Sequence, residues 1–339
     1  QRDLNRALLA RQLLLERVDE PIPTVLEQIC GIQNQYAPNA YIRLWSTIRN
    51  FRRDDLTRSY EDRSVVQATM MRGTIHTASA RDYRLFVAAI RPSQRDWARR
   101  ITRTDDSDLE AVIARVRAKL RGRAVARAEL LELKAGSSAA SWLTLDAHTE
   151  LLRLPPSGTW DSRRAHTFGL ADDWLGPGDS PPEAEAIAHL VRRYLGGFGP
   201  ASVGDVAAFT YIPMSTLKPI LARMPLRRFV DERGKELLDV EDAPLPPADT
   251  PAPVRFLPTW DAVLLVHARR TGILDEAYRK IIFAAKVPPS FPTFLVYGRV
   301  VGTWKYVDGR VVLDAFEPLD RATRRELDDE AERLAAFHA

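Results

Sequence analysis

Three times along the chain, a group of helix-like segments is followed by a short β-like segment that a turn signal interrupts. The first such segment, SVVQATMMRGTIHTAS, covers residues 64–79 and breaks at Gly73. The second, LRLPPSGTWDS, turns between Pro155 and Gly158, and the third, LRRFVDERGKELLDV, turns at Arg233 and Gly234. A winged helix consists of helices followed by a hairpin, so the pattern predicts three winged-helix units.

The helices that precede each hairpin are predicted from apolar residues at helical spacing. They are expected at residues 4–18, 22–33 and 39–51 in the first unit, at 108–122, 125–134 and 137–152 in the second, and at 183–195, 202–209 and 213–224 in the third. The letters of the three units are not alike, so the repeat is one of pattern.

Two segments rich in proline, glycine and aspartate, 171–183 and 242–253, are the expected linkers. After the second, VRFLPTW, AVLLVHA and TFLVYGRVVGTWKYVDGRVVLDAF have a β-like texture, with turns at Gly298 and at Asp308-Gly309. They predict a small barrel or curled sheet, closed by a C-terminal helix over residues 321–337. The predicted fold is α+β and mainly α. Its units are winged helices at 1–80, 81–175 and 182–242, then a β-barrel with its helix at 252–339.

Composition narrows the function. With 45% hydrophobic and 28% charged residues, the 339-residue chain has the composition of an ordinary globular protein. Its single cysteine, Cys30, excludes an internal disulfide and a cysteine-rich metal site, and suits a reducing cytoplasm. No apolar run reaches the roughly 20 residues of a membrane span, so we expect no membrane association.

Charge is distributed unevenly. Residues 1–135 carry 25 Lys and Arg against 17 Asp and Glu, whereas the remainder carries 24 against 28. This asymmetry indicates a polyanionic partner for the N-terminal part. The alternative is a compositional bias toward arginine, which supplies 42 of the 49 basic residues.

Several strong catalytic motifs are missing from the sequence. It contains no phosphate-binding glycine loop, no HExxH and no GxSxG, and its six histidines lack metal-ligand spacing. We therefore expect neither a metal nor a cofactor.

A row of arginines follows the first hairpin. Arg91, Arg95, Arg99 and Arg103 are spaced by four residues, so on a helix they project from one face. Such a row can follow a phosphate backbone, with Arg95 and Arg99 as the candidate contacts, or it can simply be a solvated face.

The stretch GIQNQYAPNAY (31–41) places two glutamines, Gln33 and Gln35, two residues apart. Taken with RLWSTIR, MRGTIHTASARDY, FLPTWDAVLLVHARR and GRVVGTWKY, it resembles the AlkZ-like and YcaQ-like winged-helix DNA glycosylases over nearly the whole chain. The resemblance implies tandem winged helices and a barrel in a C-shaped channel that accepts DNA. It also implies removal of N-alkylated bases, including bulky adducts and interstrand crosslinks.

In that family a short motif of Gln, an apolar residue, and Gln or Asp positions the hydrolytic water. Gln33 and Gln35 match the two polar positions, whereas Asn34 departs from the apolar one. An amide does not titrate at neutral pH, but its carbonyl can accept a hydrogen bond from water and aim it. That suffices for a base made cationic by alkylation, such as N7-alkylguanine or N3-alkyladenine, because it leaves as a neutral species.

Without the resemblance, both glutamines are better read as caps of backbone groups between two helices. His76 either lines the DNA channel or hydrogen-bonds inside the hairpin, and Arg72 is expected to be structural or to face a phosphate. Arg269 and Arg270 are expected to approach DNA. Asp261 is expected to pair with an arginine internally, and the aromatic residues Trp260, Trp304 and Tyr306 are expected in the core.

The sequence thus predicts a monofunctional, cytoplasmic, nucleoid-associated DNA glycosylase that acts as a monomer on duplex DNA carrying alkylated purines. Two alternatives stay open. One is a winged-helix transcriptional regulator without catalysis, and the other is a relative that has lost activity, which the departure at Asn34 leaves possible.

Overall fold

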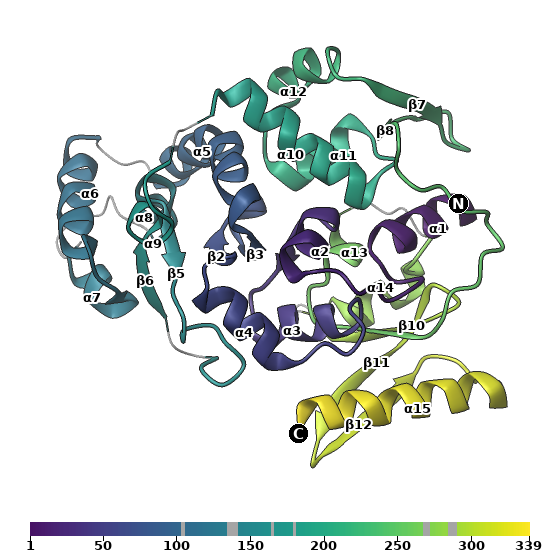
Figure 1. The fold of residues 1–339 in the computed structure, drawn as a ribbon. Helices are drawn as coiled ribbons and strands as arrows, with labels where there is room; N and C mark the ends of the chain where they lie inside the picture. The colour runs from purple at the N-terminus through teal and green to yellow at the C-terminus, as the bar shows by residue number, and fades with distance from the viewer. Residues whose placement is uncertain (103–105, 134–141, 164–165, 179–180, 267–271, 284–289) are drawn as a thin grey trace.

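The structure is a computed structural model that describes residues 1–102, 106–133, 142–163, 166–178, 181–266, 272–283 and 290–339 (Figure 1). The first unit contains α1 (Arg2–Arg11), α2 (Ile22–Gln28), β1 (Ile32–Gln33), α3 (Pro38–Trp45), α4 (Arg53–Glu61), β2 (Val65–Thr69), the short 3-10 helix η1 (Met71–Gly73) and β3 (Ile75–Ser79). The hairpin and its break at Gly73 are confirmed. α4 was not predicted, because RDDLTRSYE offers few apolar residues.

The second unit is joined to the first through one sheet. It contains α5 (Ala80–Thr102), α6 (Asp106–Leu120), β4 (Val125–Ala126), α7 (Arg127–Glu132), α8 (Trp142–Thr149), β5 (Leu151–Arg153), β6 (Thr167–Leu170) and α9 (Ala171–Leu175). β2 pairs with β5, which gives a six-stranded sheet in the order β1-β3-β2-β5-β6-β4. The second predicted hairpin needs correction, because β5 pairs with β6, whose residues lie beyond the predicted segment 152–162, so a longer loop replaces the turn at Pro155 to Gly158. The β2–β3 and β5–β6 hairpins are parts of one continuous sheet.

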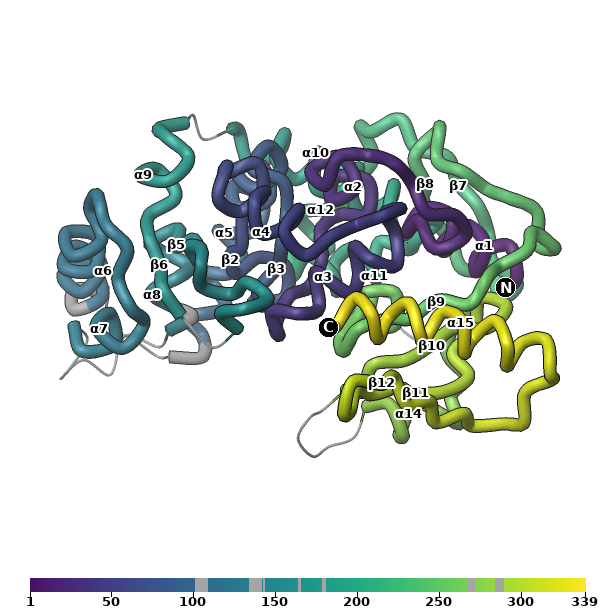
Figure 2. The backbone as a smooth tube through the Cα atoms, turned by 60° about the horizontal axis from the view of Figure 1, so that its bottom comes forward, coloured from purple at the N-terminus to yellow at the C-terminus, as the bar shows by residue number. Residues whose placement is uncertain are grey.

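The third unit consists of α10 (Glu183–Phe198), α11 (Val203–Thr210), α12 (Met214–Leu221), β7 (Leu226–Val230) and β8 (Glu236–Val240). Its hairpin turns where the sequence predicts, with Gly234 at φ 77°. α10 packs against α5, α1 and α2. In both views α6 and α7 form one end of the molecule, and the N-terminus, the β7–β8 hairpin and α15 lie toward the other (Figures 1 and 2).

The C-terminal region is a curled sheet with helices. It contains β9 (Arg255–Leu257), α13 (Ala262–Leu265), α14 (Glu276–Ile282), β10 (Thr293–Val296), β11 (Arg299–Val307), β12 (Arg310–Ala315) and α15 (Arg321–His338). The strand order is β12-β11-β10-β9, and among the described residues the two edge strands do not pair with each other. The predicted closed barrel is therefore wrong: four strands are too few to close, and α15 packs on β12 while α3 packs on β9.

Two further expectations need correction. AVLLVHA was predicted as β-like, but its first part forms α13, whose start is capped by Asp261 Oδ1, which accepts from the Val263 amide at 3.0 Å. Short apolar runs do not distinguish a strand from a buried helix. The first expected linker begins with α9, because Asp172 and Asp173 suit a helix start and Trp174 packs against the Arg63 guanidinium, 4.5 Å from its ring.

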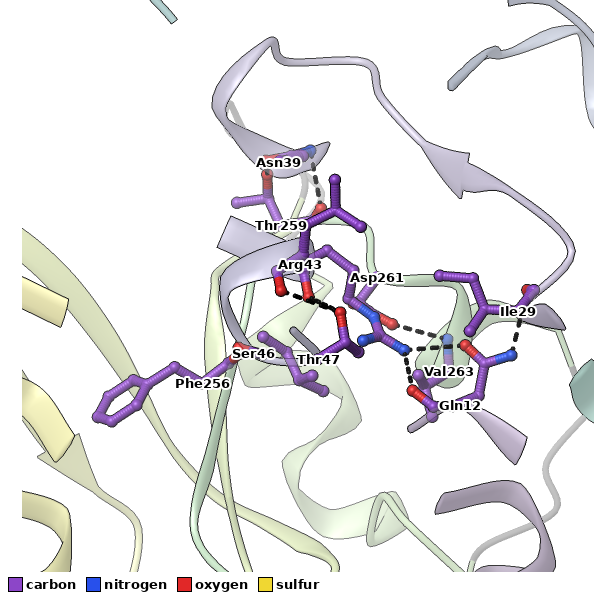
Figure 3. A network of polar contacts seen from close by, with 12 residues as sticks. Gln12, Ile29, Asn39, Arg43, Ser46, Thr47, Phe256, Thr259, Asp261 and Val263 are labelled. Carbon is purple, nitrogen blue, oxygen red and sulfur yellow. Dashed lines mark hydrogen bonds and ion pairs between the residues drawn. The ribbon is translucent and has the colours of Figure 1, made fainter. Parts of the chain in front are cut away.

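A buried polar network ties the first unit to the C-terminal region (Figure 3). Arg43 on α3 forms an ion pair with Asp261, Nε to Oδ2 at 3.1 Å, as expected for that aspartate. The same guanidinium donates to the backbone and side-chain oxygens of Gln12, both at 2.9 Å. Burial raises the pKa of Asp261 and lowers the pKa of Arg43, and the attraction between the two groups opposes both shifts.

Replacing Arg43 by methionine should lower the free energy of unfolding by about 3–5 kcal/mol, because it leaves the Asp261 carboxylate buried without its cation. Chemical denaturation measures this loss. The matched control is Arg58→Met, which removes an exposed arginine that pairs with Asp55 on the same helix. That change should cost less than about 0.5 kcal/mol, and equal losses in the two variants would contradict the importance of the network.

Candidate active site

The two glutamines lie where α2 gives way to the edge strand β1. Cys30 and Gly31 end the helix with positive φ angles of 62° and 74°. A Cβ on Gly31 would lie 3.1 Å from the Thr77 carbonyl oxygen, so glycine is needed both for the turn and for the close approach to β3. β1 then pairs with β3, which puts Gln33 directly opposite His76.

Asn34 points into the protein and fixes the loop. Its side chain is fully buried, and one amide atom lies 3.1 Å from Thr77 Oγ1. The other amide atom lies 2.9 Å from the Tyr36 carbonyl oxygen and 3.2 Å from that of Ala37. Since a carbonyl only accepts, the atom facing Tyr36 and Ala37 is Nδ2. The polar residue at this position is thus satisfied by hydrogen bonds.

The orientation of the Gln33 amide follows from its contact with Arg72, whose Nη2 donates to Gln33 Oε1. A guanidinium has no acceptor, so the Gln33 atom that faces it must be the oxygen, and the NH₂ group points away. The Gln33 side chain is 6% exposed, which leaves it little freedom to turn over. Among the described residues the Gln33 side-chain amide makes no hydrogen bond to a backbone group, so the backbone-cap interpretation does not fit Gln33.

Arg72 is held by a strained turn and by an aromatic ring. Its φ is 57°, in the left-handed region that non-glycine residues seldom occupy, and Gly73 follows at 66°. Its guanidinium carbon lies 4.9 Å from the centre of the Phe209 ring on α11. Burial lowers the pKa of Arg72 from its usual value, while the hydroxyl of Tyr211 acts in the opposite direction.

His76 hydrogen-bonds inside the hairpin and does not reach the surface. It is 1% exposed, and its Nδ1 lies 2.9 Å from the Thr74 carbonyl oxygen. That contact makes Nδ1 the protonated nitrogen. Burial, reinforced by the charge of Arg72, lowers the pKa of His76 to about 3, so the ring is neutral at physiological pH.

Gln35 is exposed, and its Oε1 accepts from the Ile75 amide at 3.3 Å. A carbonyl oxygen has two lone pairs, so it can accept a second hydrogen bond. Tyr36, which follows, is 46% exposed. Two cavities of about 590 Å³ open elsewhere between described residues, and Gln33, Gln35 and Arg72 line neither.

The predicted row of arginines on α5 is less exposed than its spacing suggests. Arg91 is buried and donates to Gln94, and Arg95 donates from Nε to the Ala147 carbonyl on α8 at 3.1 Å. Arg99 is exposed, 3.9 Å from Asp96. Arg91 is therefore neither a phosphate contact nor part of a solvated face, because α8 packs against α5. Arg103, Arg269 and Arg270 lie outside the described residues.

Sequence reasoning missed Phe209, whose ring lies against the Arg72 guanidinium, and Arg163, which contacts the residue after Gln35. Arg163 Nη1 donates to the Tyr36 hydroxyl at 3.3 Å. No local sequence pattern marks Phe209 or Arg163. A clue to a contact in this region was the aromatic residue Tyr36, directly after Gln35. Within the described ranges, no group of three or more His, Cys, Asp or Glu side chains could hold a metal ion, and no helix there is long and apolar enough to cross a membrane.

Comparison with known proteins identifies the family. The family model for AlkZ-like DNA glycosylases matches residues 26–337. The chain belongs to the AlkZ-like DNA glycosylase family. Members of this family hydrolyse N-glycosidic bonds in damaged DNA, so this AlkZ-like protein is a DNA repair enzyme, not a transcriptional regulator.

Individual relatives agree over almost their full length. This AlkZ-like chain is 25% identical over 366 residues to the interstrand DNA cross-link repair glycosylase of Streptomyces sahachiroi, covering 96% of the chain and 93% of that protein. Its fold matches the solved structure of Streptomyces sahachiroi DNA glycosylase AlkZ with a TM-score of 0.83 at 21% identity, over 99% of this chain and 96% of that one.

The neutral, buried His76 predicts an acid-sensitive stability. Its pKa is depressed in the folded state, so its contribution is present above the unfolded-state pKa of ~6.5 and is lost as pH falls toward about 3. At pH 5 the loss should be ~2 kcal/mol relative to pH 7.5. His76→Asn keeps a donor for the Thr74 carbonyl but cannot titrate, so its unfolding free energy should fall less on acidification. An identical pH dependence in both proteins would refute this assignment.

Proposed function

We propose that this AlkZ-like glycosylase removes cationic N-alkylated purines, N7-alkylguanine and N3-alkyladenine, from double-stranded DNA. The observation that carries the proposal is the charge of the site. The two glutamines are uncharged, and among the described residues no hydrogen bond or ion pair joins Gln33, Gln35, Arg72 or His76 to a carboxylate. A site without a general base suits a substrate that is already activated.

The two amides complement each other around one water molecule in the proposed mechanism. Gln33 presents its NH₂ group, because Arg72 occupies its carbonyl, and donates to one lone pair of the water. Gln35 accepts one hydrogen of the same water through the second lone pair of Oε1. The remaining lone pair of the water faces the sugar. A donor on one side and an acceptor on the other restrict the orientation of the water.

The reaction is then a hydrolysis. The bond between C1′ of the sugar and N9 of the purine breaks, and its electrons leave with the base, which thereby loses its positive charge. The water oxygen bonds to C1′ and releases a proton to solvent. Normal bases leave as anions unless protonated, and this site provides no acid, so it discriminates against them.

The openness of the site supports a broad range of lesions. One side of the site faces solvent, because Gln35 is exposed, whereas Gln33 is buried. The relative from Streptomyces sahachiroi is named for interstrand cross-link repair. We extend the proposal on this basis to bulky purine adducts and to interstrand crosslinks.

Alanine at either glutamine should slow excision of N7-methylguanine from a duplex by tenfold or more, on the ~10²–10³ scale of losing one preorganised polar group. Abasic-site formation under single-turnover conditions, with protein in excess, measures this rate. Gln28→Ala is the matched control, because Gln28 is an exposed glutamine on α2 outside the site. Wild-type rates in both Gln33→Ala and Gln35→Ala would remove the glutamines from the mechanism.

Substitutions of Arg72 distinguish a role in positioning Gln33 from a contact with a DNA phosphate. Arg72→Met removes the donor that orients Gln33, so the single-turnover rate at saturating protein should fall about tenfold or more while DNA affinity changes little. Loss of affinity and a weaker salt dependence, with an unchanged saturated rate, would instead favour the DNA-contacting role predicted from sequence. Arg72→Lys, which keeps one donor and the charge, should lie between the two.

A further inference from the structure

Trp160 lies between two arginines beside the catalytic loop. Its ring is 4% exposed and sits in the loop between β5 and β6, which reaches toward α4 in Figure 1. The Arg53 guanidinium lies 5.1 Å from the ring centre, and the Arg163 guanidinium lies 4.7 Å from it. Three segments far apart in sequence therefore converge here: the start of α4, the second hairpin loop and, through Tyr36, the residues after Gln35.

Both arginines are fixed in place by contacts other than ion pairs. Arg163 donates from Nε to the Trp160 carbonyl at 2.7 Å and from Nη1 to the Tyr36 hydroxyl at 3.3 Å. Arg53 donates from Nη1 to the His338 carbonyl at 3.3 Å. Over the part of the chain that the structure describes, neither guanidinium pairs with a carboxylate.

Electrostatics makes this cluster unusual. Two like charges approach one indole ring, and Arg53 is the first residue of α4, where the helix dipole disfavours a cation. Burial, reinforced by the charges of Arg163 and Arg53, lowers the pKa of His338 to about 4. Cation–π contact offsets part of the repulsion but leaves the positive charge uncompensated. An anion is the ligand that such an arrangement favours.

We propose that Arg163, Arg53 and Tyr36 form a binding surface for a backbone phosphate of the DNA strand that carries the lesion. The proposal rests on the proposed function only in taking DNA as the partner. Tyr36 directly follows Gln35, so a phosphate held by Arg163 is close to the nucleotide that the glutamines address. The cluster is rigid before DNA arrives, since stacking and backbone hydrogen bonds already hold the guanidinium of Arg163.

The test is the salt dependence of binding to an undamaged duplex, followed by fluorescence anisotropy. Arg163→Met keeps an aliphatic side chain against Trp160 but removes the charge, whereas Arg163→Lys keeps the charge. We expect Arg163→Met to bind roughly tenfold more weakly at ~0.1 M salt, with a slope of log affinity against log salt smaller by about one. Arg163→Lys should restore the wild-type slope. Arg53→Met should reproduce the effect of Arg163→Met.

Arg49→Met is the matched control, because that exposed arginine already pairs with Glu16 and Asp19. It should leave the slope unchanged. A wild-type slope in Arg163→Met, or the same reduced slope in Arg163→Lys, would overturn the proposal. Melting temperatures identify any variant that has lost its fold, and Arg53→Met then supplies the second measurement.

Excision distinguishes this proposal from the proposed function. Arg49→Met, the control outside the proposed surface, should release N7-methylguanine at the wild-type rate at saturating protein. If wild type releases no base at all, the proposed function fails while the binding result stands on its own. If wild type releases base and Arg163→Met binds normally, the phosphate surface fails and the function stands.

Discussion

The buried guanidinium of Arg43 is the contact on which the arrangement of the site depends. It binds Asp261 in the C-terminal region and both oxygens of Gln12 at the end of α1. Gln12 in turn donates to the carbonyl of Gly197 on α10 at 2.8 Å and to that of Ile29 at 3.2 Å. Ile29 immediately precedes the turn that begins β1. Because removing one partner of a buried ion pair leaves an uncompensated charge, this network holds the start of β1 relative to three other parts of the chain.

Neighbouring groups set the orientation of the uncharged amides of Gln33 and Gln35. Gln33 and Gln35 have no protons to gain or lose at neutral pH, so their chemistry depends on which end of each amide is free. Arg72 takes the oxygen of Gln33, and the Ile75 amide binds the oxygen of Gln35 from the backbone. Asn34 between them turns inward and holds the loop.

Some of the positive charge of the first part of the chain lies in the interior. Arg11 binds Asp239 through two hydrogen bonds at 2.6 and 2.8 Å, and Arg43 and Arg91 are likewise buried. A surplus counted along the sequence therefore overstates the charge available to DNA. Arg163, which lies outside that part, is exposed and is held against an aromatic ring instead of a carboxylate. Placement, more than the number of arginines, decides which of them can meet a phosphate.

The sequence by itself determined the local elements and the family. The hairpins at 64–79 and 226–240, the turns at Gly298 and Asp308-Gly309 and the terminal helix follow from periodicity and turn residues, which act over a few positions. The tertiary structure alone decided the joining of β2 to β5, the open four-stranded sheet, the inward turn of Arg91 and the meeting of Arg72 with Gln33. Those contacts join residues 39 or more positions apart or depend on what covers a helix face. No local pattern encodes them, because burial and partner choice are set by the packing of the whole chain.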